Sequence, residues 1–363
     1  MTIVRITLMV ALLSVPSTTL AGMAGIFTID RSQPTTYPGG TNFASFTEAV
    51  AALMADGVDA AVVLEAYDDG GSYDEGVTIG QVPGVSADRR VTFRAAPGEE
   101  VVIGNTPAPA FQLFAQAPGA DPRYITIEGF TMSGFGWYAV HARNADWITI
   151  RGCRIAAGEP SVPAIYFEGD AGDYCQFPVI TNNMITGNPY MAIALYNAPG
   201  AEVDFNSIHQ SNSSSWGIWV VSSDGATAPA RISNNAVYCV TGLPIEFNSS
   251  VALPLTMNHN VWYSEAGYVG RVDGVLHYTI GDWRTATGME AQSLADDPRF
   301  LTSDDLHIDY DSPCFEAGET VPGIETDIDG DLRDSPPEIG ADELPRPSLI
   351  FADGFESGDT TAW

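Results

Sequence analysis

The chain has 363 residues, and its 15 basic against 46 acidic side chains give a formal net charge of −31 at pH 7. We expect no nucleic-acid partner, because too few basic side chains are present to neutralise phosphates. The sequence contains no lysine, which excludes P-loop, Schiff-base and pyridoxal chemistry that depends on one. The 36 glycines and 24 prolines, beside 45% hydrophobic residues, indicate a folded, turn-rich protein of mostly β structure.

Residues 1–24 have the pattern of a secretory signal peptide. Arg5 is the only charge before an apolar run from Ile6 to Val15, and small residues offer cleavage after Ala21 or Ala24. A run of about ten residues is too short for a helix across the bilayer. The alternative is a buried N-terminal strand or helix. No later run reaches about 18 apolar residues, so we expect no transmembrane segment in the mature chain. We therefore expect a secreted or cell-surface protein. We also expect it to be a monomer.

An amphipathic helix is predicted next, over Phe43–Met54, with Thr41 or Asn42 as its N-cap. Five apolar side chains share one face of this helix: Phe43, Phe46, Val50, Leu53 and Met54. Short strands follow it. The apolar face is therefore expected to cover the open end of the structure that the following residues form.

A six-residue pattern, apolar at its first and last positions, recurs through the middle of the chain. Its copies IEGFTM, IRGCRI, ITNNMI, VDFNSI, ISNNAV and MNHNVW begin at Ile127, Ile150, Ile180, Val203, Ile232 and Met257. The starts are 23 to 30 residues apart, and a second apolar segment follows the first five copies at a similar period. Such units, built only of short strands and turn residues, indicate a parallel β-helix with coils about 4.8 Å apart.

The fourth position of this pattern is asparagine in four successive copies: Asn183, Asn206, Asn235 and Asn260. We expect their amides to hydrogen-bond along a column at one corner of the coils, with each asparagine supplying the left-handed backbone of a tight corner. The alternative is that asparagine is present only as a common turn residue.

Four cysteines are present, and an even number in an exported protein usually forms disulfides. Cys153 and Cys175 are separated by about one repeat, so we favour a disulfide between them. The pair Cys239–Cys314 follows by elimination. Buried free thiols are the alternative.

Several stretches resemble secreted right-handed parallel β-helix proteins of the pectin-lyase-like superfamily. They are FASFTEAVAAL from Phe43, GVDAAVVLEAYDDGGSYDEGVTI from Gly57 and the coils with NN pairs. DSPCFEAG from Asp311 and DIDGDLRD from Asp327 are similar to a C-terminal module of the choice-of-anchor kind. No enzymatic activity is carried over, because the NTD, GHG and RIK motifs of polygalacturonases and the catalytic lysine of lyases have no counterpart.

The resemblance implies an all-β fold, a right-handed parallel β-helix solenoid with an N-terminal helical cap. The expected boundaries are a strand and capping helix at 25–60, the β-helix at 61–280, an anchor-like or capping module at 281–345 and a tail motif at 346–363.

The acidic stretch of the C-terminal module is a candidate Ca²⁺ site, with Asp327, Asp329 and Asp331 as ligands. The EF-hand order is not met, because Gly330 occupies the fourth position of the stretch rather than the sixth. A solvated acidic turn is the alternative. The histidines, His307 included, show no spacing typical of metal ligands.

A second candidate is a glycan-binding face on the second strand of each coil. Side chains on both sides of the central apolar residue point outward, and seven of them are expected to stack on one sheet: His141, Arg143, Tyr166, Glu168, Tyr196, Trp219 and Glu246. Aromatic rings beside charged groups suit a polysaccharide or cell-surface glycan. A solvated sheet face is the alternative.

We therefore expect a secreted or cell-surface protein that contacts carbohydrate, without assignable catalysis or a required cofactor. One alternative is a polysaccharide lyase or glycoside hydrolase that uses the same face. The other is a non-catalytic adhesin or structural surface protein.

Overall fold

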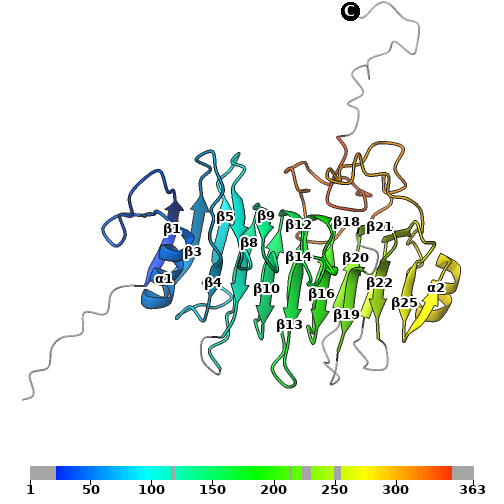
Figure 1. Ribbon diagram of the computed structural model, residues 1–363, viewed down its shortest axis with the longest axis horizontal. Helices are drawn as coiled ribbons and strands as arrows, with labels where there is room; N and C mark the ends of the chain where they lie inside the picture. Colours follow the sequence, from blue (N-terminus) through cyan, green and yellow to red (C-terminus); the bar gives the residue numbers. More distant parts are fainter. Residues whose placement is uncertain (1–21, 116–118, 212–214, 223–229, 249–254, 346–363) are drawn as a thin grey trace, which may run out of the picture.

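The computed structural model describes residues 22–115, 119–211, 215–222, 230–248 and 255–345. The predicted signal peptide, apart from its last residues, and the predicted tail motif at 346–363 lie outside the described residues. The described chain forms one elongated stack of coils with a long C-terminal segment folded back over one side (Figure 1).

Three sheets run along the stack, and each coil between residues 91 and 272 contributes one strand to each sheet. The described chain before residue 91 has no named strand in sheet B. Sheet A consists of β2 (Asn42–Phe43), β1 (Met23–Ile29), β3 (Val58–Ala66), β5 (Val91–Ala95), β8 (Ile125–Glu128), β11 (Thr149–Arg151), β14 (Val179–Thr181), β17 (Glu202–Asp204), β20 (Ala230–Ser233) and β23 (Leu255–Asn258). Sheet B consists of β6 (Val102–Thr106), β9 (Thr131–Phe135), β12 (Arg154–Ala157), β15 (Met184–Gly187), β18 (Ser207–Gln210), β21 (Ala236–Cys239) and β24 (Val261–Ser264). Sheet C consists of β4 (Val77–Ile79), β7 (Phe111–Leu113), β10 (Val140–Arg143), β13 (Ile165–Glu168), β16 (Met191–Tyr196), β19 (Trp216–Val221), β22 (Leu243–Phe247), β25 (Gly270–Val272) and β26 (Val275–His277).

The predicted repeat is confirmed in its register. The first apolar residues of the six copies pair in one row of sheet A: Ile127, Ile150, Ile180, Val203, Ile232 and Met257. All six are buried, because the alternation of the strands turns them toward the interior. The pairing of named strands is parallel except between β25 and β26, which form an antiparallel hairpin at the end of sheet C.

The predicted asparagine column is also confirmed, at the corner between sheets A and B. The Nδ2 groups of Asn183, Asn206 and Asn235 each donate to the Oδ1 of the next asparagine, at 2.9, 3.0 and 3.1 Å. All four asparagines are fully buried. In one respect the expectation was wrong: the left-handed backbone belongs to the residue before each asparagine, for example Phe205 with φ 56°.

The ends of the stack are covered as a solenoid requires. At the first end, α1 (Phe46–Asp56) buries Phe46 and Leu53 against the coils. Ser45 caps this helix, so it begins three residues later than expected, because Phe43 belongs to strand β2. At the other end, α2 (Ile280–Thr287) buries Trp283.

The carboxylate of Glu290 ends the asparagine column. It accepts hydrogen bonds from Asn260 Nδ2 at 3.2 Å and from Trp262 Nε1 at 2.7 Å. Burial raises the pKa of Glu290, although these hydrogen bonds oppose the shift. The last amide of the column is therefore paired rather than left at an open end.

The cysteine expectation was wrong for the described chain, in which all four cysteines are free and buried. Cys153 occupies the asparagine column, where its backbone N–H donates to Asn183 Oδ1 at 3.0 Å. Cys175 lies elsewhere in the coil, with its Sγ 3.5 Å from the carbonyl oxygen of Ala142. A separation of about one repeat therefore did not place the two thiols in one column.

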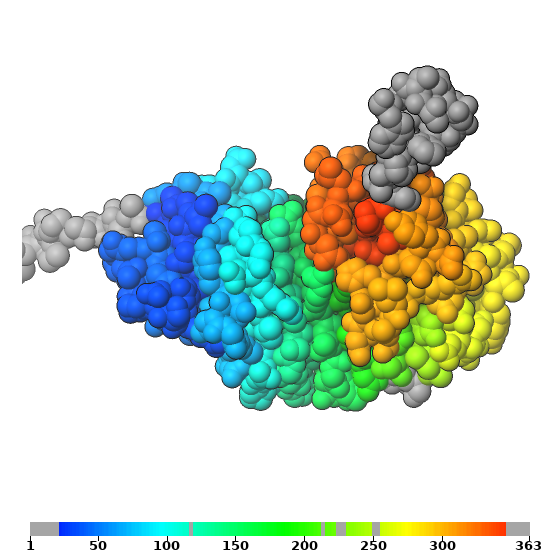
Figure 2. Space-filling model, turned by 90° about the horizontal axis from the view of Figure 1, so that it is seen from above, coloured from blue at the N-terminus to red at the C-terminus, as the bar shows by residue number. Residues whose placement is uncertain are grey.

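Residues 294–345 form a C-terminal segment, which has no named helix or strand among its described residues. Its apolar residues Leu306, Ile308, Ile339 and Ala341 pack on the outer side of sheet B. Figure 2 shows the orange and red atoms of this segment over the green coils. No helix in the described ranges is long and apolar enough to cross a membrane.

Candidate functional site

The seven side chains expected on one sheet lie in two neighbouring rows on the outer side of sheet C. In the first row His141, Tyr166, Ala194, Trp219 and Glu246 are successive partners. In the second row Arg143, Glu168 and Tyr196 are successive partners. Parallel pairing places the members of a row about 4.8 Å apart.

His141 is the most enclosed member of this face. Its ring is surrounded by Phe114, Tyr138 and Tyr166, at centroid distances of 4.5, 4.3 and 5.0 Å. Its Nε2 lies 3.0 Å from Glu168 Oε2. Burial lowers the pKa of His141, and the hydrogen bond with Glu168 partly opposes this shift. The His141 side chain is only 10% exposed, so its main contact on this face is the one that orients Glu168.

Two aromatic side chains of this face are partly exposed and lie farther along the stack. The rings of Tyr196 and Trp219 are parallel, with an interplanar angle of 8° and centroids 6.4 Å apart. Beside them the Arg271 guanidinium pairs with Glu246 at 2.5 Å and lies 5.6 Å from the Trp216 ring centroid. The face therefore combines aromatic edges with fixed charged groups.

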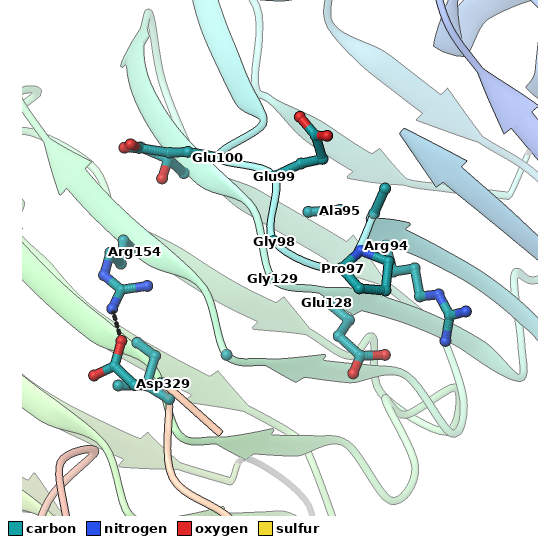
Figure 3. Close-up of a pocket in the computed structure, with 14 residues that line it drawn as sticks. Arg94, Ala95, Pro97, Gly98, Glu99, Glu100, Glu128, Gly129, Arg154 and Asp329 are labelled. Carbon is teal, nitrogen blue, oxygen red and sulfur yellow. Dashed lines mark hydrogen bonds and ion pairs between the residues drawn. The ribbon is translucent and has the colours of Figure 1, made fainter. Parts of the chain in front are cut away.

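A cleft that the sequence did not predict lies on the other side of the molecule. Three adjoining hollows of about 600, 440 and 340 Å³ form it. One wall is the turn at 95–100, the floor is the outer side of β9 and β12, and the opposite wall is the C-terminal segment at 304–307 and 323–330. Figure 3 shows Arg154 and Asp329 at one side of the largest hollow and Glu99 and Glu100 at another.

The arginines of the cleft are neutralised by carboxylates. Arg94 pairs with Glu65, Arg151 with Glu128 and Arg154 with Asp329. The carboxylates of Glu99 and Glu100 make no ion pair with any described residue and lie at the rim. The cleft is thus acidic, and it favours a neutral or cationic ligand over an anionic one.

Beside this cleft, the His307 imidazole lies between two carboxylates. Its Nε2 is 2.8 Å from Asp329 Oδ2, and its Nδ1 pairs with Asp305 Oδ1. The hydrogen bond with Asp329 is the main cause that raises the pKa of His307 to about 9, and burial opposes it.

The structure does not bring together the three carboxylates suggested for Ca²⁺. Both oxygens of Asp327 accept backbone N–H groups, Oδ1 from Asp329 and Asp331 and Oδ2 from Glu343. The carboxylate of Asp329 pairs with Arg154 and His307, and Asp331 is exposed. Asp327 therefore organises the turn instead of sharing a ligand position with its neighbours.

Comparison with known families agrees with this architecture. Residues 119–271 match the family model described as a right handed beta helix region. The fold is a right-handed parallel β-helix. No curated protein matches the chain.

The matched region of the β-helix contains the sheet C face and the floor of the cleft, but it ends before the C-terminal segment that forms the opposite wall. The repeat period could place residues on the face because successive coils are in register. The repeat period could not predict the cleft, because one wall of the cleft is the C-terminal segment, whose sequence does not repeat. The AAPGEE turn before β6, with two adjacent glutamates, was the one local signal of the rim.

Proposed function

We propose that this protein is an exported carbohydrate-binding protein that holds a glycan along the outer side of sheet C. The observation that carries the proposal is the pair of rows that contains Tyr166, Tyr196 and Trp219 beside Arg143, Glu168 and Glu246. Sugar rings pack on apolar aromatic surface, while fixed charged groups hydrogen-bond to hydroxyls. The rows run along the stack, so an extended chain could contact several coils.

The same face gives little support for hydrolysis or elimination. His141 is enclosed by three rings, and Arg143 pairs with Asp170 at 2.9 Å. Glu168 and Glu246 are separated by three coils in the register, roughly 14 Å at the normal strand spacing. This exceeds the roughly 5 to 9.5 Å between paired carboxylates of glycosidases. We therefore favour binding over catalysis.

The net negative charge of the protein favours neutral over acidic glycans as ligands. A protein of charge −31 repels polyanions at long range, although salt screens this effect over about 8 Å. Neutral polysaccharides are accordingly the expected ligands.

The test is affinity electrophoresis of the secreted protein against a panel of neutral and acidic polysaccharides, followed by titration with the best oligosaccharide. Trp219→Ala and Tyr196→Ala should each weaken binding roughly tenfold or more, as truncation of a central aromatic contact does. The matched control is Tyr263→Ala, because Tyr263 is also an outward aromatic residue in ring contact with a neighbour, Tyr238, but on sheet B. Absence of binding to the whole panel, or equal binding by all three variants and the wild type, would refute the proposal.

A further inference from the structure

Three potential metal ligands of the C-terminal segment converge beside the cleft. One ring nitrogen of His307 and one carboxylate oxygen each of Asp329 and Asp342 lie within 4.8 Å of one another. This is the only such group of three among the residues that the structure describes. We propose that His307, Asp329 and Asp342 bind one divalent transition-metal ion, with Zn²⁺ preferred. An imidazole nitrogen with two carboxylate oxygens is a donor set that suits Zn²⁺.

Each of these side chains is oriented by an outer group that holds its other polar atom. Asp305 pairs with His307 Nδ1, Arg154 donates to Asp329 Oδ1 at 2.6 Å, and the Ile308 N–H donates to Asp342 Oδ2 at 2.8 Å. A histidine ligand of a metal usually has a carboxylate or carbonyl on its second nitrogen. The atoms that remain for an ion are His307 Nε2 and Asp329 Oδ2, which are hydrogen-bonded to each other, together with a carboxylate oxygen of Asp342.

The distances and charges are compatible with a bound ion. His307 Nε2 and Asp329 Oδ2 are hydrogen-bonded at 2.8 Å. Two ligands about 2.1 Å from a tetrahedral ion are about 3.4 Å apart, so the two atoms would separate by about 0.6 Å when an ion replaces their hydrogen bond. The carboxylates of Asp305, Asp329 and Asp342 face a single guanidinium, that of Arg154. Metal ligation requires a neutral imidazole, so His307 would release its proton on binding. The three carboxylates and Arg154 then leave an excess of two negative charges, which a divalent ion would balance.

The position of the site leaves the ion accessible. Asp342 is 6% exposed and anchors the buried side. His307 and Asp329 also line the cleft, so further coordination positions would face a hollow wide enough for water or a ligand oxygen. Three protein ligands with an open position is the pattern of accessible rather than purely structural zinc sites.

The experiment uses the full mature chain, treated with EDTA, desalted and titrated calorimetrically with Zn²⁺ or Ca²⁺ in 0.15 M NaCl to screen unspecific cation binding. One Zn²⁺ should bind per chain, and Ca²⁺ should bind far more weakly because calcium prefers all-oxygen sites. His307→Gln and Asp342→Asn should each weaken Zn²⁺ binding roughly tenfold or more. Asp331→Asn is the matched control: it removes a carboxylate from the same segment, outside the cluster, and should leave the affinity unchanged.

Circular dichroism in EDTA establishes that each variant is folded before titration. Co²⁺ gives an independent readout, because its visible absorption reports nitrogen ligation, and His307→Gln should change the spectrum of the Co²⁺-loaded protein. The proposal is overturned if the wild type binds no stoichiometric Zn²⁺, if the two ligand variants bind as the wild type does, or if Asp331→Asn alone abolishes binding. Glycan binding by sheet C plays no part in these measurements, so either proposal can fail without the other.

Discussion

Substitution of Asn206 by leucine tests the asparagine column directly. Asn206 is fully buried, and its Oδ1 accepts hydrogen bonds from the backbone N–H and the Nδ2 of Asn183 at 3.1 and 2.9 Å. Its Nδ2 donates to Asn235 Oδ1 at 3.0 Å and to the carbonyl of Ile180 at 2.9 Å. Leucine has a similar volume, so the change removes hydrogen bonds without opening a large cavity.

The expected loss follows from the groups left behind. The Asn183 N–H stays buried without its partner, which costs about 1–3 kcal/mol, and the broken amide-to-amide contacts add about 1 kcal/mol. We therefore expect the free energy of unfolding to fall by about 2–4 kcal/mol, measured by urea denaturation with circular dichroism. The control is Asn188→Leu, since Asn188 is partly exposed and such changes usually stay within about 0.5 kcal/mol. If both variants unfold at the same urea concentration, the column does not contribute as argued.

Three further predictions concern the column, the thiols and a buried carboxyl group. Cys153→Asn should leave the free energy of unfolding unchanged or raise it by up to about 1 kcal/mol. The reason is that Cys153 Sγ already lies 3.9 Å from the Ile127 carbonyl, to which an asparagine amide at this position would donate. A clear loss of stability in urea denaturation would contradict this. Ellman's reagent should find no reactive thiol in the native protein and four after denaturation without reductant, since all four cysteines are free and burial raises the pKa of each; fewer than four would reveal a disulfide. Burial, and then the neighbouring Glu343, raise the pKa of Glu338 to about 9. The folded protein therefore favours the protonated carboxyl group of Glu338. The stability that this group contributes is complete below its ordinary pKa near 4.5 and is lost as the pH rises toward 9. Glu338→Gln should therefore raise the melting temperature at pH 8 and flatten its decline between pH 5 and 9, and an unaltered pH profile would show that Glu338 is not the titrating group.

The sequence predicted those parts of the fold that repeat. Ile150 and Ile180 could be placed in one row because the apolar pattern and the asparagine column share one period, and both depend on the same interior packing. The start of α1 was predicted three residues too early, since Phe43 fits the apolar face of a helix as well as the short strand β2 that it forms. The left-handed residue of each corner was misplaced by one position. Both residues of the pair Asn182–Asn183 favour turns, and at the corner before Asn206 the left-handed residue is Phe205, a type that rarely adopts this backbone.

The contacts made by the C-terminal segment could not be predicted in this way. His307, Asp329 and Asp342 are brought together by an aperiodic stretch that follows the outer side of sheet B. Such a path depends on matching shape and charge between distant residues, as in the pairing of Arg154 with Asp329. The expected Cys153–Cys175 disulfide failed for a related reason, since the loop between the two residues moves Cys175 away from the asparagine column.

The way in which residues 294–345 cross several coils affects how the molecule comes apart. Coils in contact only with their neighbours can be lost one at a time from an end. Here Asn182 donates to the Thr326 carbonyl at 2.7 Å, Asn234 to the Glu319 carbonyl at 3.0 Å and the Ala341 N–H to Ser207 Oγ at 2.9 Å. Fraying of the last coils must therefore also detach this covering chain from coils nearer the middle, which couples their unfolding into a single cooperative step and shields them from proteases that digest loosened ends.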